Sequence, residues 1–136
     1  MIYLPDTNAW IGLLRRTNAR LVQQFEQVNP EDLRLCSIVL GELLYGVSRS
    51  HLENQAHNLA LVSRIRERFL SLPFDDIAAE AYGRIRSYLA GIGMPIGPND
   101  LLIASIASAN GMILVTHNVR DFGRVPGLIV EDWETT

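Results

Sequence analysis

The chain of 136 residues contains no lysine, and all twelve of its basic side chains are arginines. A P-loop needs a lysine to reach its phosphates, and a Schiff-base enzyme needs one as its nucleophile. Receiver domains and haloacid-dehalogenase-like phosphatases also place an aspartate after a first strand, but their usual pattern includes a lysine. The missing lysine therefore argues against four classes of α/β protein.

Cysteine, histidine and long apolar runs are also scarce. Cys36 is the single cysteine, so it cannot form an internal disulfide, and we expect a cytoplasmic protein in which it is a buried apolar residue. With three scattered histidines the chain offers no zinc-ligand set. No apolar run approaches the ~20 residues that span a bilayer. Because Met1 leads directly into an apolar stretch, we expect no signal peptide.

Apolar stretches alternate with amphipathic ones along the chain. Hydrophobic residues make up 48% of the sequence, which is typical of a globular protein, and the length suggests one domain over 1–132 with a short tail over 133–136. We predict strands over 2–4, 33–36, 71–74, 112–116 and 128–130. We predict helices over 9–14, 19–28, 38–47, 52–69, 77–89 and 101–110, with Asn18, Ser37 and Asp75 or Asp76 as caps. This alternation indicates an α/β fold with a parallel sheet covered on both faces.

Asp6 stands where the first strand gives way to the first helix. Pro5 lacks a backbone donor, so a central strand cannot continue past it. The helix pattern begins at Ala9. In an open α/β sheet, such a carboxyl end is where ligands bind. We therefore ask which other side chains converge on Asp6.

Two further acids have unusual surroundings. Glu42 interrupts an apolar helix close to Gly41 and Gly46, which cost a helix interior ~1 kcal/mol each relative to alanine but leave room for a ligand. Asp100 opens an apolar helix behind a loop that contains two prolines. Simpler roles remain open, because Asp6 and Asp100 could cap helices and Glu42 could point into water.

The loop after the strand 112–116 is a fourth candidate region. Asp121 could be a ligand, or it could bond its own backbone as loop acids commonly do. Asn118 could order a turn or a bound water. His117 could act as a general base or lie in solvent.

Four short motifs stand out along the chain: Asp6-Thr7-Asn8, Ser37 followed by Glu42, Asn99 to Ala104, and Thr116-His117-Asn118 with Asp121-Phe122. In this order and spacing they resemble the PIN-domain family, and more narrowly the VapC-type ribonuclease toxins of bacterial toxin–antitoxin pairs. The resemblance runs nearly end to end and includes the closing segments 124–128 and 131–133.

The resemblance implies a single-domain α/β/α sandwich with a five-stranded parallel sheet of order 3-2-1-4-5. It implies that Asp6, Glu42 and Asp100 meet the loop 118–121 around one pocket. Many members carry an aspartate where this chain has Asn118, so Asp121 is the expected fourth carboxylate.

Crowded carboxylates demand a cation. Two of them ~5 Å apart repel by ~3 kcal/mol at an effective dielectric of ~20. Oxygen ligands favour Mg²⁺, with Mn²⁺ as a substitute, and such an ion can activate water for attack on a phosphodiester. We expect Asp6 and Asp100 as direct metal ligands, and Glu42 and Asp121 as water-mediated ligands, ligands of a second metal or orienters of water. The net charge of −3 does not by itself indicate a nucleic-acid binder, but a bound metal ion would let an acidic protein hold an acidic polymer.

The expected function is therefore a Mg²⁺-dependent endoribonuclease toxin that forms a homodimer. By resemblance, a small VapB-type antitoxin neutralises it by inserting an arginine among the carboxylates. The helix over 40–47 and the first helix could be docking surfaces, or plain core. The candidate substrate contacts are Thr7, Asn8, Arg15, Arg16, Asn118 and Arg120.

Three alternatives stay open on the sequence. A PIN-like module could bind RNA or a protein without cutting. A glycosidase could use two carboxylates without a metal. A DNA nuclease would carry the same residues. Chelation of the metal separates the nucleases from the first two.

Overall fold

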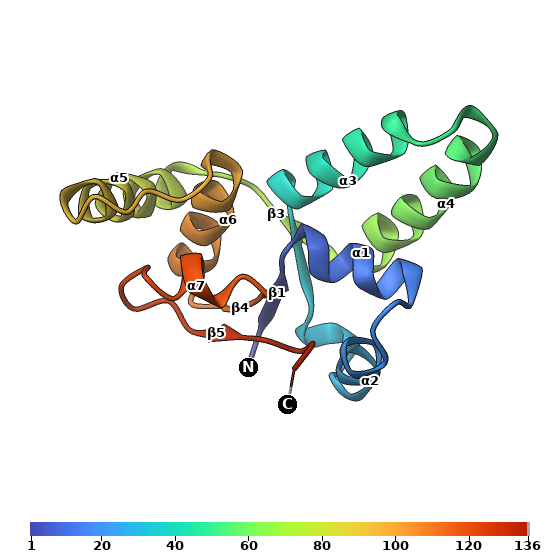
Figure 1. Cartoon of the computed structure of the whole chain (residues 1–136), viewed down its shortest axis with the longest axis horizontal. Helices are drawn as coiled ribbons and strands as arrows, with labels where there is room; N and C mark the ends of the chain where they lie inside the picture. Colours follow the sequence, from blue (N-terminus) through green and yellow to red (C-terminus); the bar gives the residue numbers. More distant parts are fainter. Residues whose placement is uncertain (136) are drawn as a thin grey trace.

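Five short parallel strands form the centre of the protein, described here over residues 1–135 of a computed structural model (Figure 1). Parallel pairs join β1 to β4 and β4 to β5 in one sheet, and β2 to β3 in a second. An isolated parallel bridge between Tyr3 and Leu33 lies between the two sheets. The expected parallel α/β architecture is present, with the strands divided three and two. The strands are β1 (Tyr3–Pro5), β2 (Arg34–Cys36), β3 (Leu70–Leu72), β4 (Ile113–Val115) and β5 (Val130–Glu131).

Helices follow nearly every strand, as the sequence pattern predicted. In Figure 1, α3 and α4 run as a pair on one side of the strands, and α5 lies with α6 on the other. The segment 117–122, expected to be a loop, contains the additional helix α7. The helices are α1 (Thr7–Arg15), α2 (Ala19–Gln27), the 3₁₀ helix η1 (Pro30–Asp32), α3 (Ser37–Arg49), α4 (Leu52–Arg68), α5 (Asp76–Gly91), α6 (Pro98–Ala109) and α7 (Val119–Phe122).

Two of the predicted helix caps are confirmed and one is wrong. The Asn18 carboxamide accepts from the Leu21 amide at 3.0 Å, and the Asp75 carboxylate accepts from the Ala78 amide at 3.0 Å. Ser37 does not cap α3, because β2 runs into this helix without a turn and Ser37 is already its first residue. Its hydroxyl instead donates to the Leu72 carbonyl at 3.3 Å.

The core is aromatic around α1 and α2. Trp10 is fully buried, and its ring packs against Phe25 and Phe69 with centroids 5.3 and 5.0 Å away. Trp133, 4% exposed, packs against Phe25 and Tyr3. This contact holds the start of the predicted tail 133–136 against the first strand, while residue 136 lies outside the described residues. Cys36 is buried as expected, and no helix within 1–135 is long and apolar enough to cross a membrane.

The parallel strands β1, β4 and β5 end at one edge of their sheet. The Asp6 amide donates to the Val115 carbonyl, and the Thr116 amide donates to the Glu131 carbonyl, both at 2.9 Å. The residues that follow β1 and β4 are therefore neighbours. Since α1 and α7 also begin at this edge, their first turns face the same region.

Candidate active site at the carboxyl edge

Asp6 combines a cap with a buried charge. One oxygen of its carboxylate, Oδ1, accepts from the Ala9 amide at 2.9 Å and so caps α1. The residue is 7% exposed. Burial raises the pKa of the Asp6 carboxyl, and hydrogen bonds from Thr116 and Ala9 oppose that rise only in part. The cap role is thus confirmed.

Asp100 is the most perturbed acid of the site. It lies in the first turn of α6, half-buried behind the loop that ends at Gly97. Burial raises the pKa of its carboxyl to about 6, and the charges of Asp6, Glu42 and Asp121 add to the rise. The fold therefore brings the four predicted acids close enough to act on one another, although they come from four separate elements.

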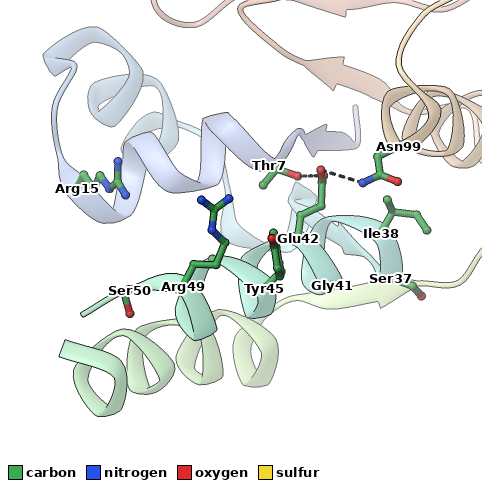
Figure 2. A pocket seen from close by; sticks show the side chains of 11 residues that line it. Thr7, Arg15, Ser37, Ile38, Gly41, Glu42, Tyr45, Arg49, Ser50 and Asn99 are labelled. Carbon is green, nitrogen blue, oxygen red and sulfur yellow. Dashed lines mark hydrogen bonds between the residues drawn. The ribbon is translucent and has the colours of Figure 1, made fainter. Parts of the chain in front are cut away.

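Glu42 is fixed by two neighbours. Its Oε1 accepts from the Thr7 hydroxyl, and its Oε2 accepts from the Asn99 amide nitrogen at 3.2 Å (Figure 2). Both donors come from the first residues of helices, α1 and α6. The expected motifs contained Asn99, but only the fold shows that it reaches across to α3. Glu42 does not point freely into water.

Asp121 differs from the other three acids because it already has a cationic partner. Its Oδ1 accepts from Arg124 at 2.9 Å, and its Oδ2 accepts from the Asn118 amide at 3.1 Å. The Asn118 side chain caps α7, and the Asn118 backbone N–H donates to the Thr116 hydroxyl at 3.0 Å. Asn118 thus orders the turn, which was one of its two expected roles. Thr116 stood in one of the expected motifs, but only the fold shows that it contacts both Asn118 and Asp6.

An open cleft of about 800 Å³ runs along α3, with Ser37 and Ser50 among its lining residues and Glu42 between them. Figure 2 shows Thr7 and Asn99 beside Glu42, with Arg15, Arg49 and Ser50 on one side of them and Ile38 and Ser37 on the other. Apart from adjacent residues and the backbone of α3 itself, no atom lies within 4 Å of the place where a Cβ of Gly41 or Gly46 would stand. The expected open space beside Glu42 is therefore present.

The predicted substrate contacts fall into different places. Thr7 and Arg15 line the cleft. Asn8 is exposed next to Thr7, and Arg120 is exposed on α7 beside Asp121. Arg16 instead pairs with Glu26 of α2 at 3.0 Å. Tyr45 and Arg49 line the cleft but were missed. Their spacing of three and seven residues from Glu42 was the available signal.

A model of one protein family, the PIN domain, matches residues 3–128. The chain belongs to the PIN-domain family. Within it, the chain is 37% identical over 131 residues to the tRNA(fMet)-specific endonuclease VapC of Salmonella typhimurium, covering 96% of this chain and 97% of the relative. It is 36% identical over 135 residues to ribonuclease VapC2 of Rickettsia felis, covering 98% and 99%. These identities place this PIN domain among the VapC ribonucleases.

Solved structures agree with the sequence relatives. The crystal structure of DNA-bound VapBC from Salmonella typhimurium contains a chain that matches with a TM-score of 0.89 at 36% identity, covering 98% of both chains. VapBC2 from Rickettsia felis, bound to a promoter DNA fragment, matches with a TM-score of 0.88 at 35% identity, covering 98% of this chain and 99% of that one. The resemblance inferred from the motifs is confirmed at the level of the family.

The donor set of this PIN domain fits a hard divalent ion. Asp6, Glu42 and Asp100 offer only oxygen, and no arginine or histidine in residues 1–135 forms an ion pair with them. The raised pKa values of Asp6 and Asp100 mark a site whose negative charge lacks a counterion. An ion that keeps several of its waters, as Mg²⁺ does, suits carboxylates that do not converge on one point.

A second polar cluster lies beside this site. The His117 Nδ1 is 3.0 Å from an Asp132 oxygen and 3.8 Å from a Glu134 oxygen. Hydrogen bonding and charge from Asp132 raise the pKa of the exposed His117 ring, and Glu134 adds to this effect. Within residues 1–135, these three side chains form the one His, Cys, Asp or Glu group whose potential ligand atoms all lie within 4.8 Å of one another. The sequence did not predict this cluster.

Proposed function

We propose that this VapC-family PIN domain is a Mg²⁺-dependent endoribonuclease toxin that hydrolyses RNA phosphodiester bonds. The observation that carries the proposal is the crowding of acids around Asp100, which has no paired cation and whose pKa is raised to about 6 by burial and by the charges of Asp6, Glu42 and Asp121. Crowded acids without a cationic side chain beside them bind either a proton or a divalent ion. Family membership supplies the reaction class.

In this proposal, Asp6 and Asp100 hold the ion. Mg²⁺ held there would supply an activated water and would neutralise charge on the scissile phosphate. Glu42, held by Thr7 and Asn99, keeps one orientation and accepts a proton or a hydrogen bond from the attacking water. Asp121 acts through Arg124 and Asn118, because the Arg124 guanidinium already compensates its charge, whereas the two neutral donors of Glu42 do not.

We further propose transfer RNA as the class of substrate, because the Salmonella relative is named a tRNA(fMet)-specific endonuclease. Thr7 and Arg15 would contact the substrate from the cleft, and Asn8, Asn118 and Arg120 from its surroundings. Arg16 is outside this set because it pairs with Glu26.

A VapB-type antitoxin is the proposed partner. The related structures are VapBC complexes. A mainly apolar groove of about 330 Å³ lies between α1, α3 and α4 and meets the cleft at Arg15, Gly46 and Ser50. A hydrophobic antitoxin segment would fit this groove while an arginine beyond it reaches the acids. Its apolar lining comprises Ile11, Leu14, Leu43, Val47, Leu61 and Val62.

Two finer predictions belong to the same proposal. The bridge between Tyr3 and Leu33 supports a continuous strand order of 3-2-1-4-5 across the two sheets. The homodimer stays a prediction, which light scattering of the purified protein tests.

The experiment is cleavage of bulk transfer RNA by the purified protein with Mg²⁺ and with EDTA. We expect cleavage in Mg²⁺, none in EDTA, and none by Asp100→Asn in either. Binding without cleavage in every condition would support the non-cutting module. Cleavage of DNA in preference to RNA would reassign the substrate.

A further inference from the structure

Helix α3 continues beyond Glu42 with two side chains that the proposed chemistry does not use. Tyr45 and Arg49 follow Glu42 by three and seven residues, so they share its face of the helix. At 1.5 Å per residue they lie ~4.5 and ~10.5 Å further along the axis. Both side chains line the same cleft as Glu42 (Figure 2).

Tyr45 is a large aromatic side chain left in solvent. It is 62% exposed, whereas the buried ring of Trp10 packs against Phe25 and Phe69 in the core. The Arg49 guanidinium lies over its ring, with Cζ 5.5 Å from the centroid. Proteins that bind single-stranded nucleic acid combine such aromatic rings, on which bases stack, with arginines that follow the backbone.

The charge of the cleft changes sign along its length. Glu42 lies in its acidic part, next to Asp100 and Asp6. Toward Ser50, the lining includes Arg15 from α1 and Arg49 from α3. A polyanion whose scissile phosphate lies at the acids would therefore place a neighbouring phosphate near the two arginines. The open space beside Gly41 and Gly46 leaves the path between them clear.

We propose that Tyr45, Arg49 and Arg15 form a subsite for a nucleotide flanking the cleaved bond of single-stranded RNA. The base stacks on Tyr45, and its phosphate binds the two guanidinium groups. This inference rests on the proposed ribonuclease function. RNA is favoured over a protein segment because Arg49 joins Arg15 in the lining of the cleft, whereas the adjoining groove between α1, α3 and α4 has Arg15 as its one arginine and is mainly apolar.

The test compares steady-state cleavage of bulk transfer RNA in Mg²⁺ by Tyr45→Ala, Tyr45→Phe and Arg49→Gln. Base stacking on an aromatic side chain contributes about 1–3 kcal/mol, so we expect Tyr45→Ala to raise KM about tenfold while kcat stays within about twofold. Tyr45→Phe keeps the ring and should keep the wild-type KM. Arg49→Gln should also reduce the salt dependence of binding, by about 0.7 in the log–log slope for one phosphate contact.

The matched controls are Tyr88→Ala and Arg86→Gln on α5. Tyr88 is also well exposed, at 48%. Arg86 also lies over a tyrosine ring, that of Tyr82, but this pair lines a different pocket. Both control variants should cleave like the wild type.

The outcomes separate this inference from the proposed function. Absence of cleavage by the wild-type protein in Mg²⁺ would overturn both. Magnesium-dependent cleavage with the same KM in Tyr45→Ala would overturn the subsite alone. A change of oligomeric state in Tyr45→Ala, or loss of antitoxin binding with RNA cleavage intact, would reassign this face to a protein interface and equally overturn it.

Discussion

Two groups of acids lie close together at the carboxyl edge of this sheet, and their electrostatic surroundings are opposite. Asp6 and Asp100 are buried or half-buried without a cationic partner, and their pKa values are raised. Asp132 lies against the exposed ring of His117. Hydrogen bonds from Glu134, His117 and Thr135 hold the pKa of Asp132 below its usual value, against the opposing effect of burial.

The comparison shows that close spacing of ligand atoms is a poor guide to which group needs a metal. The His117 cluster has its potential ligand atoms within 4.8 Å of one another, but its two acids have in His117 a partner that carries positive charge when protonated. The acids around Asp100 have no such internal compensation, because burial and mutual repulsion disfavour their ionised forms. We therefore expect the cation at the acids around Asp100 and not at the His117 cluster.

Neutralising one acid in each group should give the largest difference between the two groups. Asp100→Asn, or Asp6→Asn, should lower the rate of RNA cleavage in Mg²⁺ by on the order of a thousandfold, about 4 kcal/mol of transition-state stabilisation. Asparagine also caps helices, so Asp6→Asn should retain α1, which circular dichroism checks. Asp132→Asn should cleave within about twofold of the wild type. A thousandfold loss in Asp132→Asn instead would reverse the assignment.

The orientation of Glu42 gives a smaller effect. Thr7→Val removes the hydroxyl that donates to the Glu42 carboxylate but conserves the shape of the side chain. A hydrogen bond to a charged group contributes ~1.5–3 kcal/mol, so we expect kcat to fall at least about tenfold. Thr17→Val, at an exposed position just after α1, is the matched control. Equal kcat values for the two variants would show that Glu42 needs no such support.

Stability against pH tests the missing counterion directly. Because the folded-state pKa of Asp100 is raised to about 6 from 3.8, its contribution to stability is most favourable below about pH 4 and is lost as the pH rises through 6. Metal-free protein should therefore lose more stability between pH 4 and 7 than Asp100→Asn does. At pH 7, millimolar Mg²⁺ should raise the wild-type melting temperature by a few degrees and leave Asp100→Asn unchanged. Calorimetry of both proteins measures this difference, and an equal response to Mg²⁺ would contradict it.

The smallest effect concerns His117. Asp132→Asn should lower the pKa of the His117 ring toward its ordinary value, because the hydrogen bond and charge of Asp132 are the main causes of its rise. The pH dependence of the ring's NMR signals follows this change. An unchanged His117 pKa would show that Glu134 alone supplies the compensation.

The sequence was sufficient to predict the elements of the fold and the location of Asp6. Pro5 does end the first strand, and helices follow where apolar periodicity begins. Helix α7 was missed because four residues are too few for a periodic pattern. The division of the strands into two sheets could not be predicted either, because pairing depends on contacts between distant segments.

The convergence of the acids could be predicted from the sequence, but the groups that hold them could not. Asp6, Glu42 and Asp100 stood out because their surroundings are otherwise apolar or tightly constrained. Asn99 and Thr116 were noted only as parts of motifs, and Tyr45 was missed, since uncharged polar and aromatic residues are ordinary at such positions in a sequence. Their roles come from what lies opposite them in space. Arg16 was predicted to contact the substrate, but it pairs with Glu26, while its neighbour Arg15 lines the cleft.

The single bridge between Tyr3 and Leu33 gives the carboxylate of Glu42 a mechanical role as well. Thr7 and Asn99 belong to helices that pack with the three-stranded sheet, whereas Glu42 follows the two-stranded one. Its two hydrogen bonds therefore join α3 to the first turns of α1 and α6 beside the cleft. A ligand that took these bonds from Glu42 would remove a polar link between the three helices and leave the buried packing of Trp10 on Phe69 in place.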